Sequence, residues 1–149
     1  MTTVKQILKD KGNEYYSVRP KATVFEALQK MAEKDIGALL VIDNEGKLVG
    51  MFTERDYARK LILHGFSSKE SFVEDFMSKE LFTVSPGMTT LECMAIMTEK
   101  RVRHLPVLDH NKIVGILSIG DIVNQIIHEQ HITIKDLEKY ITGSGYGHQ

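Results

Sequence analysis

The sequence predicts a mixed α/β (α+β) protein built from two copies of one β-α-β-β-α unit. The first observation is an internal repeat, because the segment from Pro20 to Asp56 reads again from Pro86 to Asp121. The offset is 66 residues (86 minus 20) as far as Gly46 and 65 (121 minus 56) beyond it. The second is that apolar runs of strand length alternate with runs of helical periodicity. Since units of roughly 60 residues bury little surface alone, we expect the copies to pack on one another.

Each copy opens with a short helix and an extended segment. Val4, Ile7 and Leu8 lie on one predicted helical face, and Gly12 ends that helix. Residues 73–77 resume a similar helix before the second copy, so we count a leading helix as part of each repeat. The predicted domains are residues 4–64 and 73–130, joined by a linker at 65–72 and followed by a C-terminal helix and tail at 131–149.

A helix, a hairpin and a second helix complete each copy. Thr23 is the predicted N-cap of the first helix, with Glu26 as its capping-box partner, and Asp43 to Gly46 supplies the hairpin turn. Thr89 and Glu92 repeat the capping pattern in the second copy. The remaining helices are expected at Glu54 to Leu63, at Ile119 to Glu129 and, begun by Thr133 and ended by Gly143, near the C-terminus.

Composition excludes several classes of function. With 149 residues, 42% hydrophobic and 26% charged, the chain has an ordinary globular composition. A net charge of −1 with interspersed signs offers no field for nucleic acid. The apolar run from Gly37 to Ile42 is too short to span a membrane and no secretory leader opens the chain, so we expect a cytoplasmic protein without a membrane partner. Cys93 is interpreted as a buried small hydrophobe, with a redox-sensitive thiol as the alternative.

The strongest candidates for a binding function follow the third strand of each copy. Thr53 and Ser118 leave a strand, begin a helix and precede Asp56 and Asp121 by three positions. One interpretation is a capping box, which stabilises a helix start by about 0.5–2 kcal/mol without any ligand. The other is a nucleotide site, because free N–H groups at a helix start attract phosphate and a carboxylate accepts from ribose hydroxyls. The two roles can coexist.

A second candidate is the basic run from Arg101 to His104. Three groups that can carry positive charge within four residues suit a polyphosphate. Arg55 and Arg59, one turn apart, add charge near the first motif. The equivalent stretch of the first copy, residues 35–38, is neutral by comparison, so the two candidate sites differ chemically. The alternative interpretation is a solvated basic edge with a hydrogen-bonded histidine.

The doubled pattern resembles a tandem pair of cystathionine-β-synthase (CBS) domains, called a Bateman module, and is similar to stand-alone bacterial CBS-pair proteins. The resemblance rests on Gly-hydrophobic-hydrophobic-Thr/Ser-x-x-Asp at the close of each copy and on His104-Leu105-Pro106-Val107, and it spans about residues 4–130. It implies that the repeats pack by pseudo-twofold symmetry through their sheets and that modules pair into homodimers. It also implies adenosine ligands such as AMP, ADP, ATP, NAD(H) or S-adenosylmethionine in clefts between the copies.

Carried over by position, the resemblance gives the ribose to Asp56 and Asp121 and the phosphate to Thr53 and Ser118. It also implies composite clefts, with small Gly37 leaving room for a flat base. The first cleft is the more basic and is expected to take the more charged nucleotide. The expected sites combine Thr53, Arg55 and Asp56 with Val84, Arg103 and His104, and Ser118 and Asp121 with Tyr16, Val18, Gly37 and Ala38.

These observations predict a non-catalytic module that senses energy or redox state through adenosine nucleotides and changes its contacts with an unknown partner. The alternative is a ligand-free structural adaptor or dimerisation module. An enzyme is not expected, because no spacing places a nucleophile beside an oriented general base. His128 and His131 lack clustered partners, so neither a metal site nor a catalytic cofactor is expected.

Overall fold

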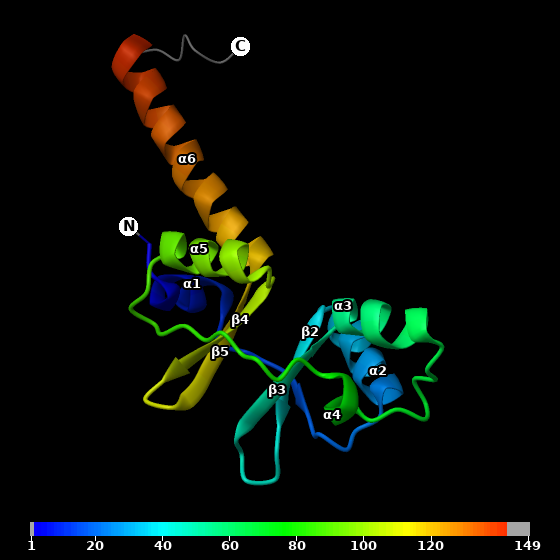
Figure 1. Ribbon diagram of the computed structural model, residues 1–149. Coiled ribbons are helices and arrows are strands. Elements are labelled where there is room, and N and C mark those ends of the chain that lie inside the picture. The colour runs from blue at the N-terminus through cyan, green and yellow to red at the C-terminus, as the bar shows by residue number, and fades with distance from the viewer. Residues whose placement is uncertain (1, 143–149) are drawn as a thin grey trace.

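A computed structural model describes residues 2–142, with side chains as far as residue 130 (Figure 1). The first copy forms a sheet in which β1 runs parallel to β2 and β2 antiparallel to β3. Its elements are α1 (Val4–Lys11), β1 (Ser17–Val18), α2 (Val24–Lys34), β2 (Ala38–Ile42), β3 (Leu48–Thr53) and three consecutive helical turns, α3 (Glu54–Asp56), η1 (Tyr57–Leu61) and η2 (Ile62–His64).

The second copy repeats this order with a smaller sheet. Its predicted first strand is reduced to one parallel bridge between Val84 and Val107, so the described sheet has two strands. Both hairpins shift register at the same place, after Val41 and after its equivalent Val107. The elements are α4 (Val73–Phe76), α5 (Thr90–Lys100), β4 (His104–Asp109), β5 (Lys112–Ser118) and α6 (Ile119–Thr142).

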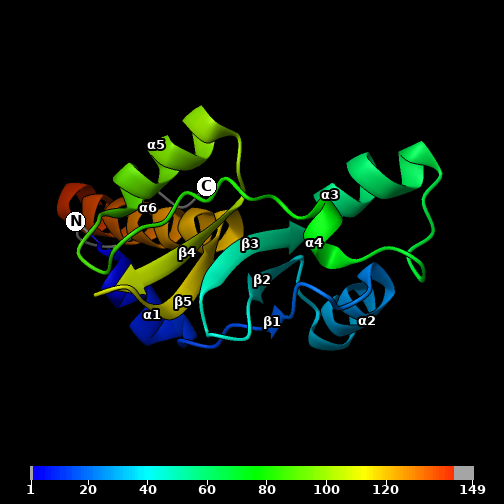
Figure 2. The same cartoon turned by 60° about the horizontal axis from the view of Figure 1, so that its bottom comes forward.

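The two sheets lie side by side at the centre, with α2 and α3 outside one and α5 and α6 outside the other (Figures 1 and 2). Leu40 and Met51 of the first sheet form a buried cluster against which Ile113 and Ile116 of the second sheet pack. Burial of this apolar surface holds the copies together. The predicted fold, two repeats packed through their sheets, is confirmed.

The leading helices are exchanged between the copies. Val4, Ile7 and Leu8 of α1 belong to the hydrophobic core of the second copy, whereas Val73 of α4 belongs to that of the first. Each leading helix therefore packs on the other copy and not on the repeat that follows it in sequence. The amphipathic face predicted for α1 is buried as expected, but in the opposite half of the molecule.

Backbone hydrogen bonds repeat across this exchange. The N–H of Lys5 donates to the carbonyl of Pro86 at 2.9 Å, and the N–H of Glu74 donates to that of Pro20 at 3.0 Å. Because Pro20 and Pro86 are equivalent positions, the two bonds are related by the approximate twofold symmetry of the repeat.

The repeated glycines of the third strands lie where the exchanged helices press on the sheets. A Cβ atom on Gly50 would lie 2.5 Å from the Met77 sulfur, and one on Gly115 would lie 2.8 Å from Cδ2 of Leu8. Real Cβ atoms do not approach so closely, so a larger residue at either position would have to displace its neighbours.

The capping predictions hold in part. Thr89 and Glu92 form the full capping box, whereas at Thr23 the hydroxyl accepts from the N–H of Glu26 and no return bond is found among the described contacts. Cys93 is fully buried, as predicted, and this burial raises the pKa of its thiol to about 11.

The helix expected at residues 54–63 is present as a continuous helical segment over residues 54–64, with a short α turn followed by a π turn and a 3₁₀ turn. One helix prediction is wrong. The helix expected to begin at Thr133 is the continuation of α6, because residues 130–132 contain no glycine or proline to interrupt it. The expected end at Gly143 lies outside the described residues. Within residues 2–142, no helix is long and apolar enough to cross a bilayer.

Candidate functional site

Two clefts lie between the copies. Cleft 1 has a volume of about 530 Å³ and combines the Thr53 motif of the first copy with the basic run from Arg101 to His104 of the second. Cleft 2 has a volume of about 450 Å³ and combines the Ser118 motif of the second copy with residues 34–38 and the end of α1. His104 lines both clefts. The composite arrangement that the resemblance implies is therefore the arrangement of the chain.

The motif in cleft 1 is a capping box. The Thr53 hydroxyl accepts from the N–H of Asp56 at 3.1 Å, and Oδ2 of Asp56 accepts from the N–H of Thr53 at 3.0 Å. The same oxygen accepts from the Thr53 hydroxyl at 3.1 Å. The capping interpretation is confirmed, and a ligand role at the same residues remains a prediction.

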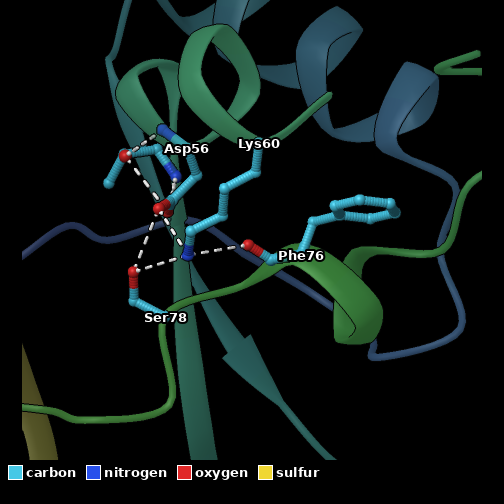
Figure 3. Close-up of polar contacts among 5 residues, drawn as sticks. Asp56, Lys60, Phe76 and Ser78 are labelled. Atoms are coloured by element: carbon cyan, nitrogen blue, oxygen red, sulfur yellow. Dashed lines mark hydrogen bonds and ion pairs between the residues drawn. The ribbon is translucent and has the colours of Figure 1, made fainter. Parts of the chain in front are cut away.

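The other carboxylate oxygen of Asp56 has two donors (Figure 3). Oδ1 lies 3.0 Å from the Lys60 amine and accepts from the Ser78 hydroxyl, also at 3.0 Å. Lys60 donates in addition to the carbonyl of Phe76 at 3.2 Å. With 8% of its surface exposed, Asp56 has partners on both carboxylate oxygens, so a ligand could reach it only where Lys60 and Ser78 leave room.

The motif in cleft 2 has the same cap and a different partner. Ser118 and Asp121 exchange the two capping bonds, at 2.8 Å to Oδ2 and 3.1 Å to the Ser118 hydroxyl. The amine of Lys11, at the end of α1, lies 2.7 Å from Oδ2 of Asp121 and donates to the carbonyl of Ile116 at 2.8 Å. A lysine from the leading helix of the first copy therefore neutralises the carboxylate of the second.

The helix starts offer fewer free N–H groups than the sequence suggested. The N–H of Glu54 donates to the carbonyl of Gly37 at 3.1 Å, and that of Ile119 donates to the carbonyl of Arg103 at 2.8 Å. The N–H groups of Asp56 and Asp121 are already used by the capping hydroxyls. Because these donors are taken, an anion in cleft 1 would depend mainly on arginine side chains.

The arginines of cleft 1 come from both copies. Arg55 donates from Nη1 to the carbonyl of Arg101 at 3.1 Å, which ties the two copies together across the cleft. Arg59 and Arg103 also line this cleft. Guanidinium groups bind phosphate through paired N–H donors, so this wall suits an anionic ligand.

His104 lines the clefts with an uncharged imidazole and not with a cation. Its burial lowers the pKa of the imidazole, and the nearby charges of Lys11 and Arg103 lower it further, whereas Asp121 acts in the opposite direction. At neutral pH, the predicted run of three cationic groups therefore carries charge at its two arginines only.

Most of the predicted site residues line the two clefts. Val84, 3% exposed, lies instead in the core of the second copy, and Val18 packs against the core of the first. The residues brought together are Thr53, Arg55, Asp56, Arg103 and His104 in cleft 1, and Tyr16, Gly37, Ala38, Ser118 and Asp121 in cleft 2.

Several cleft residues were not predicted. Lys60 lies four positions after Asp56, so helical spacing could have revealed it. Lys11 and Ser78 reach the aspartates only because the leading segments are exchanged, and no local pattern signals that contact. Asp35 also lines cleft 2. Residues 35–38, described above as neutral, are therefore acidic. Among the described side chains, no group of His, Cys, Asp and Glu could hold a metal ion.

Comparison with known proteins identifies what this architecture is similar to. A family model described as CBS domain matches residues 4–63 and 73–128. A structure of a protein with CBS domains from Burkholderia ambifaria is 51% identical, with a TM-score of 0.83 over 87% of this chain and 96% of that one. The CBS domain-containing protein CBSX3, mitochondrial, of Arabidopsis thaliana is 38% identical over 97% of this chain and 74% of its own length.

A more distant structure shares the fold. The CBS domain pair of protein MJ0100, solved in complex with 5′-methylthioadenosine and S-adenosyl-L-methionine, is 24% identical, with a TM-score of 0.75 over 87% of this chain and 98% of that one.

Proposed function

The chain belongs to the CBS-domain family as a tandem pair, and from this membership we propose that it is a non-catalytic regulatory module that binds adenosine nucleotides between its two copies. The observation that carries the proposal is the pair of composite clefts, each with a hydroxyl–aspartate motif from one copy and a facing wall from the other. Their volumes, about 530 and 450 Å³, lie within the range typical of small-ligand sites.

In cleft 1, the ribose of a nucleotide would lie beside Asp56, and the phosphates of the nucleotide would contact the arginines. The Lys60 amine, which contacts Oδ1 of Asp56, also lines this cleft and would be a further donor to a phosphate oxygen. Arg55 and Arg103 face the same space from opposite copies. A ligand held in this way bridges the two copies.

Bridging suggests how binding would act at a distance. A ligand changes the relative rotation of the copies only if it binds one arrangement better than another. Because α1 crosses from the first copy to the second, a change in rotation would move it together with α6. These helices are the surfaces through which we propose that energy or redox state reaches a partner.

Calorimetric titration tests the proposal. AMP, ATP, NADH and S-adenosylmethionine are titrated into the wild type and into Asp56→Ala and Asp121→Ala. We expect binding that is lost separately in the two variants, which would establish two sites. If the wild type binds none of the four, the nucleotide-sensor proposal fails.

The competing proposal is a ligand-free adaptor that uses its duplicated surface for assembly. An adaptor would show no thermal stabilisation by adenosine compounds, whereas a sensor gains about 2.7 kcal/mol at a ligand concentration one hundred times Kd. The fixed, lysine-paired state of both aspartates is the observation that favours the adaptor.

We also propose a homodimer. Ile119, Val123 and Ile127 follow one another at four-residue spacing on α6 and are 44%, 40% and 57% exposed. An apolar stripe of this kind is typical of a helix that packs on a partner, and a second copy of the chain is the partner we propose. Light scattering on Ile127→Asp should show the monomer mass if α6 forms the interface, and an unchanged mass would exclude it.

Catalysis and location complete the proposal. No enzymatic activity is proposed, and the thiol of Cys93 is fully buried and so out of reach of a substrate. We propose a cytoplasmic location, although the plant relative is named as mitochondrial, so fractionation of the source cell is the test.

A further inference from the structure

The two clefts carry opposite charges at one equivalent position. Arg101 ends α5 in a left-handed conformation with φ 56°, and Asp35 ends α2 in the same conformation with φ 55°. The offset between them is 66 (101 minus 35), as for the rest of the first half of the repeat. Arg101 lines cleft 1 and Asp35 lines cleft 2. The two residues therefore share a left-handed backbone conformation but carry side chains of opposite charge.

The other arginines of cleft 1 have no basic counterpart. Arg103 corresponds to Gly37, which lines cleft 2, while Arg55 and Arg59 correspond to Gly120 and to an asparagine at position 124. Each replacement removes a guanidinium that could bind phosphate. The second cleft has thus lost every arginine that makes the first one basic.

The lysines that remain in cleft 2 already have partners. Lys11 forms the 2.7 Å ion pair with Asp121, and the Lys34 amine lies 5.2 Å from the centre of the Tyr16 ring. Glu14 and Asp35 also line the cleft and form no ion pair with any described residue. An incoming ligand would therefore meet two carboxylates without ion-pair partners.

Cleft 1 shows the opposite balance. Within the described part of the chain, the four arginines of this cleft form no ion pair, and neither do Glu54 and Glu80, which also line it. The unpaired arginines outnumber the unpaired carboxylates, so the excess charge of this cleft is positive. The arginines attract an anion, and the carboxylates of cleft 2 repel it, since charges a few ångströms apart interact appreciably in a partly desolvated cleft. Specificity of this kind arises as much from repulsion of one ligand as from attraction of another.

The walls of cleft 2 suit a ligand without negative charge. Tyr15 and Tyr16 line the cleft beside Ile36 and Ile116. Aromatic and aliphatic surface binds a flat base by burial, and a tyrosine ring also attracts a cation that stands over it. Asp121 remains available to the ribose if Lys11 moves aside.

We propose that cleft 2 binds an adenosine compound that carries no phosphate, with a neutral or cationic 5′ substituent, while cleft 1 binds the phosphorylated nucleotide. This inference rests on the proposed function, because it assumes that both clefts take adenosine ligands. It divides the two sites by the charge of the ligand and makes the module a sensor of two different compounds.

Amide NMR of the ¹⁵N-labelled chain tests the division site by site. The amide of Gly37 reports on cleft 2 and that of Arg101 reports on cleft 1. The probes are 5′-methylthioadenosine, which has no phosphate, and ATP. In the wild type we expect 5′-methylthioadenosine to shift Gly37, and ATP to shift Arg101 at a concentration at least tenfold below the one that shifts Gly37.

Substitutions that reverse the charge at positions 35 and 101 make the test more specific. Asp35→Arg should strengthen ATP binding at cleft 2 by roughly tenfold, and Arg101→Asp should weaken it at cleft 1 by a similar factor. Binding of 5′-methylthioadenosine should change by less than about threefold, because this probe has no charge for the new side chain to act on. Glu45→Arg, an exposed change of the same sign that lines neither cleft, is the matched control.

The outcomes separate the two proposals. If ATP shifts Gly37 as readily as Arg101, or if Asp35→Arg leaves ATP binding at cleft 2 unchanged, selection by charge is wrong and nucleotide binding stands. If neither probe shifts either amide, the proposed function fails and the inference fails with it. Should Asp35→Arg not fold, Asp35→Asn removes the charge at a position whose left-handed backbone asparagine tolerates, and ATP binding at cleft 2 must still strengthen.

Discussion

Asp56 and Asp121 occupy equivalent positions in the two copies, yet the chain holds them in different ways. Asp56 has the Lys60 amine and the Ser78 hydroxyl on Oδ1. Asp121 has the Lys11 amine on the same oxygen that accepts the capping bond. Part of the difference is local, because Lys60 lies four positions after Asp56 and its equivalent after Asp121 is Gln125. The other part comes from Ser78 and Lys11, which are distant in sequence from the aspartates that they contact.

The length of the exchanged helix accounts for the contrast between Ser78 and Lys11. α4 ends at Phe76, and the chain then runs extended so that Ser78 bridges to Met51 on β3. α1 continues to Lys11, whose amine reaches the carbonyl of Ile116, the equivalent of Met51. Duplication kept the capping box, and a change in helix length gave each carboxylate its own partner. A repeated motif therefore does not guarantee two sites of the same chemistry.

The largest expected effect concerns which copy α1 stabilises. Ile7→Ala removes a side chain that is 4% exposed in the second core and should cost about 2–5 kcal/mol of unfolding free energy. Hydrogen exchange should speed up first in β4 and β5. Leu61→Ala, in the core of the first copy, is the control and should speed exchange in β2 and β3 instead. If hydrogen exchange in Ile7→Ala speeds up first in β2 and β3, the packing of α1 on the second copy is contradicted.

The next effect compares the two strand glycines. Gly50→Ala brings a Cβ within 2.5 Å of the Met77 sulfur and 3.1 Å of the carbonyl oxygen of Ser78, whereas Gly115→Ala meets only the flexible side chain of Leu8. We expect both to destabilise the protein by about 1–3 kcal/mol, with the larger loss at Gly50 because backbone yields less than a side chain. Gly87→Ala, which would meet nothing within 4 Å, is the control in urea unfolding. Equal losses at Gly50 and Gly115 would contradict this.

The two capping residues differ by one hydrogen bond. The Thr53 hydroxyl both accepts from the Asp56 N–H and donates to its carboxylate, whereas for Ser118 the described bond is the accepted one. Each alanine variant should cost about 1 kcal/mol, and Thr53→Ala should cost the more. Thr53→Ser keeps the hydroxyl and should recover most of the loss in thermal unfolding. No recovery would mean that the methyl group, not the cap, matters.

His104 places a partly buried imidazole in the second copy alone, because its equivalent in the first copy is Ala38. Burial lowers the pKa of the folded imidazole below 6.5, so its stabilising contribution is complete above pH 6.5. It is lost as the pH falls toward the folded-state pKa, since the unfolded chain binds a proton that the folded one resists. The unfolding free energy of the wild type should fall faster than that of His104→Gln, by at most about 1.4 kcal/mol per pH unit. Parallel curves would contradict the assignment.

The smallest effect concerns Cys93, whose equivalent in the first copy is Ala27. Because burial raises its thiol pKa to about 11, the folded protein should react with iodoacetamide only as fast as it unfolds. Urea should bring the rate to that of a free cysteine, and Cys93→Ala should not be modified. Rapid labelling of the folded chain would revive the alternative of a redox-sensitive thiol.

Elements that depend on local pattern were predicted well. The capping boxes at Thr53 and Ser118, the hairpins and α1 follow from residues within a few positions of one another. The prediction failed at α6, which continues past the end expected at Glu129 because no local signal marks a helix end there. The helix after β3 was predicted in place, but its π turn was not. Val84 was assigned to a cleft by position, although its side chain packs into the core.

The sequence by itself determined the duplication, the two aspartate motifs and the greater charge of the first cleft, because these depend on residue type and short spacing. Only the tertiary structure decided that α1 packs on the second copy, that Lys11 and Ser78 contact the aspartates, and that Arg101 and Asp35 line the two clefts. The physical reason is that packing and charge act through space. Buried apolar faces choose their partners by shape and area, and that choice brings together residues such as Lys11 and Asp121, 110 positions apart.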